Sequence, residues 1–321
     1  MKYLLTKELL GCEEKYSDIY LFLKLAARKN FQIVIIEDDE KLKNFQKHFS
    51  STVLNIVLEK IKKDVKLFTT RKSNLFKINL VKDNTSITIE EAINIISQPF
   101  LICMENNRND KNFLNFFSDN EQQYLLKDLE ASCELVYWSG GGTGELKKKI
   151  ENEDFCSTTS YVFFDSDRLP FDSTSIQKAS KEIENICISK NIKYSLLQRR
   201  FIESYVPMKS LSGYVYQNKK NKKKYNKLFQ EFSKLHCNDT RHFYNMKVGL
   251  KGDIGRVGGK QKLIKTYFYN IPSAKIQIFE NGFGDKLSAV YEEKMPISEK
   301  MKDIEGWTEI NGIVKNILMV I

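Results

Sequence analysis

The chain has 321 residues and a formal net charge of +10, and apolar residues make up 41% of it and aromatic residues 12%. This supply of core-forming residues excludes a wholly disordered chain and predicts about two domains, with one large α/β domain as the alternative. No apolar run approaches the roughly 20 residues that a membrane span needs. Lys7 and Glu8 interrupt the apolar stretch at the N-terminus, so we do not expect a signal peptide. We expect a cytoplasmic protein without membrane contact.

The first part, residues 1–98, is predicted to be a small α/β module. Its hydrophobic patterns predict, in chain order, a helix, a buried strand, a helix and two short strands at residues 8–29, 31–39, 52–65, 65–70 and 75–81. Thr88 and Glu91 have the spacing of a capping box, so another helix should begin there and end at Pro99. This part contains no group of residues that is typical of catalysis.

The second part, residues 99–215, alternates strands with helices. Strands are predicted at 99–104, 133–138, 159–164 and 193–197, and helices from about 111, at 144–151 and at 173–190. Residues 199–207 follow as helix or turn. This alternation predicts an α/β core with a parallel sheet, right-handed crossovers and flanking helices.

The third part, residues 216–321, is predicted to be a basic extension that packs on this core. It should be rich in loops over 218–262 and close with one or two helices in 298–321. Residues 201–260 hold thirteen Lys and Arg but four acids, which is nearly the whole net charge of the chain.

The densest basic segment, residues 217–227, lies beside Tyr214, Tyr216 and Tyr225. Lysines attract a phosphate backbone and aromatic rings stack on bases, so this composition favours nucleic-acid binding, with a solvated Lys-rich loop as the alternative. The lysines predicted to bind phosphate are Lys219, Lys220, Lys222, Lys223 and Lys224.

The cysteines and histidines do not indicate a zinc site. Six scattered cysteines without a CxxC pair are typical of free buried thiols in a cytosolic protein. His236, Cys237 and His242 are an incomplete ligand set without a fourth member, and we interpret them as surface or core residues.

Acidic residues and glycines follow three successive predicted strands. Glu105 ends the first, Gly140, Gly141 and Gly142 end the second, and Asp165 and Asp167 end the third. The carboxyl ends of parallel strands form the usual site in such sheets, and alternation should place the two aspartates on one side. Clustered carboxylates repel one another unless a cation lies between them, and such oxygen ligands favour Mg²⁺ or Mn²⁺. A helix cap at Glu105 and a turn at Asp165 are the alternatives.

This order of motifs resembles the Toprim domain of topoisomerases, primases and OLD (overcoming lysogenization defect) nucleases. The resemblance covers about residues 97–207. Glu105 to Asp110 is similar to the family's E-G-x-x-D, with Asn106 in place of Gly and one residue inserted before Asp110, and Phe163 to Arg168 fits the DxD motif.

A further segment resembles OLD-like nucleases in particular. Arg200 to Tyr205 is similar to their R-x-I-E-N-Y motif, with Ser204 in place of Asn. The resemblance implies that Glu203 is a metal ligand, although an ion pair with Arg199 or Arg200 is the alternative. It thus implies a site for two Mg²⁺ or Mn²⁺ ions, held by Glu105, Asp165, Asp167 and Glu203.

The resemblance also implies a catalytic lysine and a function. Lys247 and Lys251 are the candidates for a lysine that neutralises the scissile phosphate, and Arg200, Lys251 and the glycine turn are expected to contact phosphate. The expected activity is Mg/Mn-dependent hydrolysis of DNA or RNA, tRNA included, by an endonuclease.

The partners follow from the same resemblance. Because no GxxxxGK[ST] signature exists in the chain, an ABC-type ATPase would be a separate subunit. The chain would then be the effector of a bacterial antiviral defence system, and homodimer formation is a further expectation. Two alternatives stay open: a Toprim-like nucleic-acid-binding or regulatory subunit with a weak metal site, and nucleotide binding by the SGGGTGEL loop.

Overall fold

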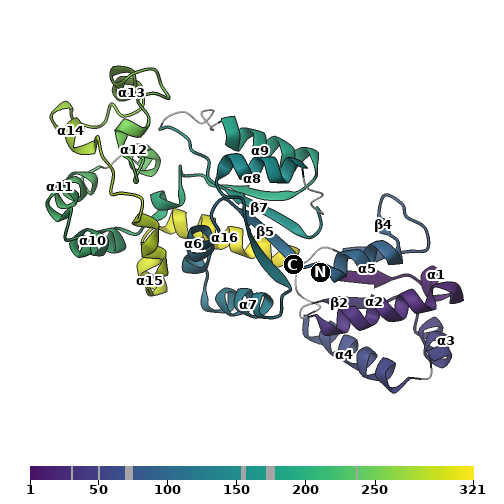
Figure 1. The fold of residues 1–321 in the computed structure, drawn as a ribbon. Coiled ribbons are helices and arrows are strands. Elements are labelled where there is room, and N and C mark those ends of the chain that lie inside the picture. The colour runs from purple at the N-terminus through teal and green to yellow at the C-terminus, as the bar shows by residue number, and fades with distance from the viewer. Residues whose placement is uncertain (30–31, 50, 69–74, 153–156, 171–177, 236–237) are drawn as a thin grey trace.

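The chain folds as an α/β protein with two four-stranded parallel sheets flanked by helices, followed by a mostly helical C-terminal part (Figure 1). The computed structural model describes residues 1–321 except 30–31, 50, 69–74, 153–156, 171–177 and 236–237. The α/β class predicted from the sequence is confirmed. None of the helices described is long and apolar enough to cross a lipid bilayer.

The first sheet has the strand order β2-β1-β3-β4. Its strands are β1 (Lys2–Leu5), β2 (Ile33–Ile36), β3 (Leu75–Ile78) and β4 (Ser86–Ile87). Its helices are α1 (Lys7–Leu10), η1 (Glu13–Lys15), α2 (Tyr16–Arg28), α3 (Asp39–Phe49), α4 (Thr52–Phe68) and α5 (Ile89–Ser97). The capping box is confirmed, since the Thr88 hydroxyl accepts from the Glu91 N–H and the Glu91 carboxylate accepts from the Thr88 N–H.

Two predictions for this module are wrong. The helix predicted over 8–29 is divided near Gly11 into α1, η1 and α2, and strand β1 before it was missed. The strand predicted near 65–70 is helical as far as Phe68, because α4 continues past its predicted end. Residues 69 and 70 lie outside the described residues.

The second sheet has the order β6-β5-β7-β8, and its two central strands are buried on both faces. Its strands are β5 (Phe100–Met104), β6 (Leu135–Ser139), β7 (Ser160–Phe164) and β8 (Lys193–Leu196). Helices α8 (Thr143–Asn152) and α9 (Lys178–Ser189) cover one face, and α6 (Asn107–Phe117), α7 (Asn120–Ala131) and α16 (Ile304–Val320) cover the other (Figure 1). Phe163 and Phe164 point to opposite faces and belong to different apolar clusters. The parallel sheet predicted for this part is confirmed.

The two sheets share one topology but differ at their carboxyl edges. In both, the first strand lies between the second and the third. At the two central strand ends the first sheet has Thr6 and Asn79, whose side chains bond each other at 3.1 Å. The second sheet has Glu105 and Asp165 in these places. Carboxylates therefore stand at the central strand ends of the second sheet only.

The C-terminal part is mostly helical, and over 218–262 its helices alternate with turns and loops. Its elements include η2 (Ile202–Tyr205), α10 (Met208–Gln217), α11 (Lys222–Phe232), α12 (Asn238–Phe243), η3 (Leu250–Gly252), α13 (Lys260–Thr266), α14 (Ile276–Phe279), η5 (Leu287–Glu292) and α15 (Ile297–Lys300). Tyr225, Leu228 and Phe232 form the buried stripe of α11 at helical spacing. The two closing helices are confirmed as α15 and α16.

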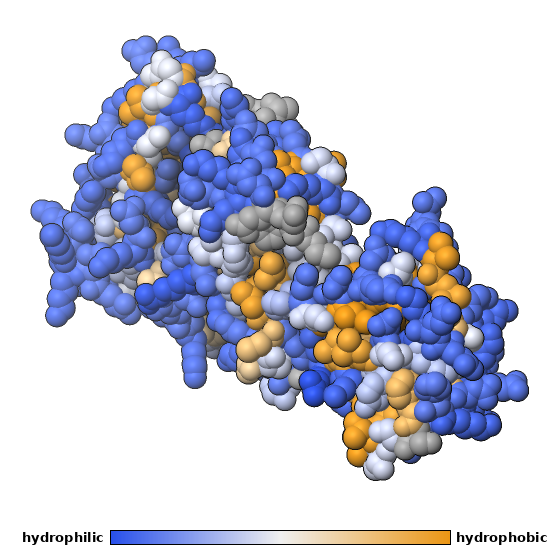
Figure 2. Space-filling model, turned by 45° about the vertical axis from the view of Figure 1, so that its right-hand side comes forward, coloured by the Kyte–Doolittle hydropathy of each residue, from blue (hydrophilic) through white to orange (hydrophobic). Residues whose placement is uncertain are grey.

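The exposed surface is mostly hydrophilic. On the face in Figure 2, hydrophilic residues cover most of the C-terminal part, at the left, and apolar patches lie among hydrophilic residues in the middle and on the N-terminal module, at the right. The two chain ends lie side by side, where the N-terminal ammonium of Met1 donates to the carbonyl of Ile321 (Figure 1).

Candidate functional site

Glu105 and Asp165 meet at the carboxyl edge of the second sheet. They follow β5 and β7, the adjacent strands at which the strand order changes direction. This topological switch point is where open α/β sheets bind their ligands. The backbone N–H of Asp165 donates to Oε1 of Glu105 at 3.3 Å. The predicted meeting of these two strand ends is therefore seen in the structure.

The glycine turn holds Glu105 from the next strand. The N–H groups of Gly141 and Gly142 both donate to the Glu105 carbonyl at 3.0 Å, and that of Gly140 donates to Met104. Gly141 and Gly142 have φ angles of +81° and +105°, which favour glycine. Because these N–H groups are engaged, the prediction that they bind phosphate is wrong. Nucleotide binding by this loop would then depend on the helix N-terminus that follows, where α8 begins at Thr143. Thr143 adds a hydrogen bond of 2.7 Å to Oε2 of Glu105.

Asp110 completes this side of the cluster. It is 7% exposed and accepts a hydrogen bond of 2.8 Å from the N–H of Asn106. Asn106 is also the N-cap of α6, which gives a local reason for asparagine at a position where the Toprim motif has glycine. Burial, followed by the charges of Glu105 and Glu203, raises the pKa of Asp110 to about 7.

Glu203 is the most deeply buried acid of the site. It lies on η2 with 0% of its surface exposed, and within the described part of the chain neither carboxylate oxygen accepts a hydrogen bond. The ammonium of Lys247 lies 3.0 Å from Oε1, an ion-pair contact without hydrogen-bond geometry. A buried carboxylate without donors is costly, so this position requires positive charge. Its partner is Lys247, and the alternative pairing with Arg199 or Arg200 is wrong.

The electrostatics join these acids into one cluster. Burial, and then the charges of Glu105 and Asp110, raise the pKa of Asp165 well above its usual value. Burial likewise raises the pKa of Glu105, although the Thr143 hydrogen bond opposes it. Burial alone would lower the pKa of Lys247, but the acids, Glu203 first, raise it. Four acids and one lysine thus interact within a single buried cluster.

Asp167 has ion-pair partners of its own, although its charge still acts on Glu105 and raises the pKa of that carboxylate. Its φ of +49° ends the extended alternation that would have placed it beside Asp165, so that expectation is wrong. Its carboxylate pairs with Arg200 and with Arg256, each at 2.9 Å. Asp165 is instead held by the N–H of Ile202 at 3.2 Å.

Arg200 is a core residue and not a phosphate ligand. It is 2% exposed and forms a two-pronged pair with Asp253, which is 1% exposed. The prediction that Arg200 contacts phosphate is therefore wrong. Asp253 and Arg256 were missed, although the sequence offered one signal: Asp253 is one of four acids among thirteen basic residues.

The site has oxygen atoms suited to a divalent cation, but its side chains do not converge on one point. Among the described residues no three His, Cys, Asp or Glu side chains converge closely enough to hold an ion. The cluster nevertheless offers only oxygen ligands, and both oxygens of buried Glu203 lack a hydrogen-bond donor within the described ranges of the chain. Hard cations are held by such ligands. In this arrangement the ammonium of Lys247 supplies the positive charge beside Glu203.

The predicted basic segment is exposed but offers fewer aromatic rings than expected. Lys219, Lys220, Lys222, Lys223 and Lys224 are all exposed, and the last three form the first turn of α11. Tyr214 and Tyr225 stack on each other with centroids 6.2 Å apart, and Tyr225 is buried. Tyr216 is exposed, with the Lys222 ammonium 5.6 Å from its ring centroid. Lys251 is bonded to Asn281 at 2.8 Å.

The other candidate ligands remain outside the site. Cys103 and Cys187 are buried as predicted, whereas Cys133 is exposed. Burial lowers the pKa of His242 to about 4, as expected of a core histidine. His236 and Cys237 lie outside the described residues.

Lys247 is positioned by a close backbone contact that gives a testable prediction. A Cβ at Gly282 would lie 2.4 Å from the Met246 carbonyl oxygen and 2.5 Å from that of Lys247. We expect Gly282→Ala to displace the Lys247 loop and lower stability by about 1–3 kcal/mol, the range for overpacking. Gly213→Ala, where no atom lies within 4 Å of the added methyl, should raise stability by about 0.5–1 kcal/mol. Urea unfolding of both variants checks this, and equal stabilities would contradict it.

No protein-family model, curated protein or solved structure matches this chain.

Proposed function

We propose that this protein is a Mg²⁺- or Mn²⁺-dependent nuclease with a Toprim-like core of the OLD type. The observation that carries the proposal is Glu203, a fully buried carboxylate that accepts no hydrogen bond from any residue the structure describes. Its charge acts on Asp110 and Asp165, which form one buried cluster with Glu105 at the switch point of a parallel sheet. So many acids near one lysine form a site that a divalent cation would stabilise.

Glu105, Asp165 and Glu203 would hold two divalent ions, and Asp167 would join them from its ion pairs with Arg200 and Arg256. When bound, such ions supply an activated water and stabilise the oxygen that leaves during phosphodiester hydrolysis. The protein's own part is to fix the ligands. Thr143 and the glycine turn orient Glu105, and the Ile202 N–H orients Asp165.

Lys247 has two roles in this proposal. In the metal-free protein its ammonium offsets the charge of Glu203, Asp165 and Asp110. Its side chain is 35% exposed, so it also reaches solvent at the edge of the cluster. There it would neutralise the scissile phosphate. Lys251 is less suited to this role, because its ammonium is bonded to Asn281.

The basic start of α11 supports a polyanion as substrate. Lys222, Lys223 and Lys224 stand in the first turn, where the helix dipole already places positive charge, and the N-cap Asn221 makes no side-chain capping bond. This arrangement is locally unfavourable for the helix. Binding of nucleic acid would relieve it.

Replacing Lys219, Lys220, Lys222, Lys223 and Lys224 by glutamine is expected to weaken nucleic-acid binding. Each lost phosphate contact should lower the slope of log affinity against log salt by roughly 0.7–0.9. Titrations at several salt concentrations measure this, together with unchanged Mn²⁺ binding. The control variant replaces exposed lysines of the N-terminal module with glutamine: Lys43, Lys47, Lys62, Lys63 and Lys66. An equal loss in both variants would mean that the segment holds no defined strand.

The activity itself is tested with purified protein, Mn²⁺ and three substrates: plasmid, linear DNA and tRNA. We expect cleavage of at least one, abolished by a chelator and restored by added Mn²⁺. Absence of cleavage from all three, in the presence of a separately supplied ATPase subunit as well, would contradict the proposal. The substrate that is cut identifies DNA or RNA.

A second function is favoured by the geometry of Asp167. Because two arginines hold this acid and no ligand set converges within the described residues, a nucleic-acid-binding or regulatory subunit with a weak metal site is the alternative. Mn²⁺ titration separates the two. Saturable binding that Asp165→Ala and Asp167→Ala remove supports the nuclease, and no saturable binding supports the regulatory subunit.

The wider role is proposed by resemblance alone. A separate ABC-type ATPase subunit would control the nuclease as the effector of a bacterial antiviral system in the cytoplasm, with the chain itself as a homodimer. Co-purification with the product of an adjacent ATPase gene tests the partnership.

A further inference from the structure

A charged pocket on the C-terminal part of the chain is lined by the residues that directly follow η2. It has a volume of about 420 Å³ and is formed by the start of α10, by α12 and by the segment around α15. Lys209, Arg241 and Lys302 supply positive charge, and Val206, Pro207 and Met208 supply apolar lining. Its lining residues include none of the acids of the metal site.

The acids of this pocket are already engaged. Glu299 pairs with Lys302 at 2.9 Å and with Lys209 at 3.6 Å. Asp303 forms a two-pronged pair with Arg199 and also caps the start of α16. Neither carboxylate forms an ion pair with the third cation, Arg241, although the charge of Asp303 acts on it.

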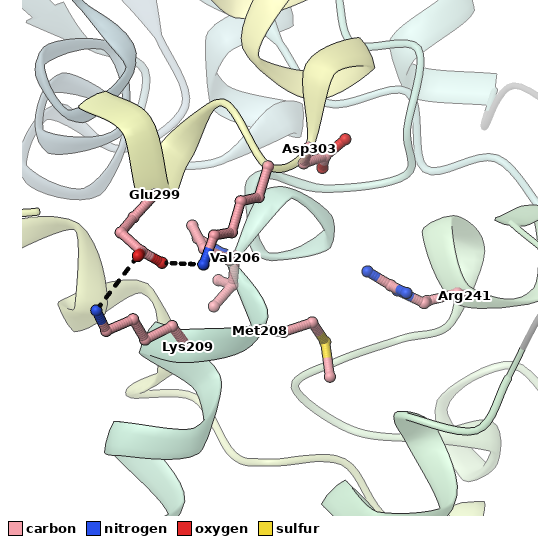
Figure 3. Close-up of a pocket in the computed structure, with 8 residues that line it drawn as sticks. Val206, Met208, Lys209, Arg241, Glu299 and Asp303 are labelled. Atoms are coloured by element: carbon pink, nitrogen blue, oxygen red, sulfur yellow. Dashed lines mark ion pairs between the residues drawn. The ribbon is translucent and has the colours of Figure 1, made fainter. Parts of the chain in front are cut away.

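Arg241 is a half-buried cation that belongs to no ion pair among the described residues. In the described part of the chain its guanidinium has no hydrogen-bond or ion-pair partner, and Figure 3 shows it pointing across the pocket toward Met208. Burial lowers the pKa of Arg241, and the charge of Asp303 only partly opposes this. A partly desolvated guanidinium gains most from an anion that accepts two of its hydrogen bonds.

The helix that forms the pocket floor adds donors of the same kind. α10 begins at Met208 after Pro207, which has no side chain that can cap the helix. The N–H groups of the first turn have no partner within the helix, and the dipole favours negative charge there. Met208 and Lys209, which line the pocket, belong to this turn.

We propose that this pocket binds the terminal phosphate of a nucleotide. Arg241 and the lysines receive the phosphate, and the apolar lining of Val206, Pro207 and Met208 receives the nucleoside. The volume lies in the range of small-molecule sites, which are mainly apolar with a few placed polar groups. The same phosphate group could belong to a free nucleotide or to the phosphorylated end of a nucleic-acid strand.

This inference goes beyond the proposed function and does not depend on it. The pocket is nevertheless connected to the metal site, because Val206 follows η2 and its N–H donates to the Glu203 carbonyl at 3.2 Å. A ligand there would contact the segment that carries Glu203.

Calorimetric titration in the presence of a chelator tests the proposal without any contribution from metal. AMP and inorganic phosphate are expected to bind saturably and adenosine is not. Arg241→Met should weaken AMP binding about ten- to hundred-fold, the worth of a hydrogen-bonded charge. Arg108→Met, which removes an exposed arginine that is paired with Glu292, should leave it unchanged.

Lys302→Gln, on the exposed wall, provides a second variant in case Arg241→Met fails to fold, and should weaken AMP binding several-fold. If a 5′-phosphorylated oligonucleotide displaces AMP, the natural ligand is the phosphorylated end of a strand. If it does not displace AMP, the natural ligand is a free nucleotide. Equal binding of AMP and adenosine, absence of AMP binding, or unchanged AMP affinity in the folded variants overturns the proposal. Mn²⁺ binding by the acidic cluster is measured separately, so failure of one proposal leaves the other standing.

Discussion

Replacing Glu105 by alanine is expected to reduce Mn²⁺-dependent cleavage more than about 100-fold, since loss of even an outer-shell partner of a metal costs about 10–100-fold. Glu105 is central to the cluster. Its carboxylate accepts from Thr143 and from the Asp165 backbone, and its carbonyl accepts from Gly141 and Gly142. The variant keeps the backbone bonds and loses the carboxylate.

The fold should survive this change, which makes the result interpretable. The charge that is removed lies among like charges, and burial raises the pKa of Glu105. Loss of the carboxylate relieves repulsion within the cluster, so the metal-free variant should be at least as stable as the wild type. Urea unfolding without metal measures this.

The matched control is Glu145→Ala. Glu145 lies on α8, close in sequence to the glycine turn, and is exposed and paired with Lys148 only three residues away. We expect unchanged cleavage and Mn²⁺ affinity. Undiminished cleavage by Glu105→Ala, or equal loss in both variants, would contradict the assignment of Glu105 as a ligand.

The second sheet was predictable because the sequence of each strand carries its own signal. Apolar strands such as β5 and β7 are buried on both faces, so their residues form continuous runs and each run ends where polarity returns, at Glu105 and at Asp165. A parallel order then brings these ends to one edge. The meeting of Glu105 with Asp165 followed from these rules.

The remainder of the site depends on contacts that no local pattern encodes. Asp167 and Asp165 share a motif, yet the left-handed backbone at Asp167 and two arginines from later in the chain separate them. The glycines suggested phosphate, but their N–H groups are taken by the neighbouring strand. Helix α11 was missed because the many lysines in its sequence indicated a loop and obscured the helical spacing of its buried residues.

Replacing Arg200 by methionine is expected to lower the free energy of unfolding by about 3–5 kcal/mol, the cost of breaking a buried ion pair. Arg200 is 2% exposed and bonds both oxygens of Asp253, at 2.6 and 2.7 Å. Methionine fills much of the same space. The loss therefore comes from Asp253, which is left charged and buried.

Arg256→Met is the control for this measurement. Arg256 also pairs with Asp167 at 2.9 Å, but its side chain is 24% exposed against 2% for Arg200. Its removal should cost about 1 kcal/mol or less, as for exposed pairs. Urea unfolding at constant salt compares the two variants, and equal losses would contradict the difference in burial.

The double variant Arg200→Met with Asp253→Leu separates stability from positioning. An apolar replacement of a whole buried pair is often neutral, so the double variant should recover most of the loss. Asp167 would then keep Arg256 but lose the guanidinium that fixes its left-handed turn. If the triad serves to position Asp167, the double variant will be stable and bind Mn²⁺ more weakly. Recovery of both stability and affinity would show that Arg200 acts only within the core.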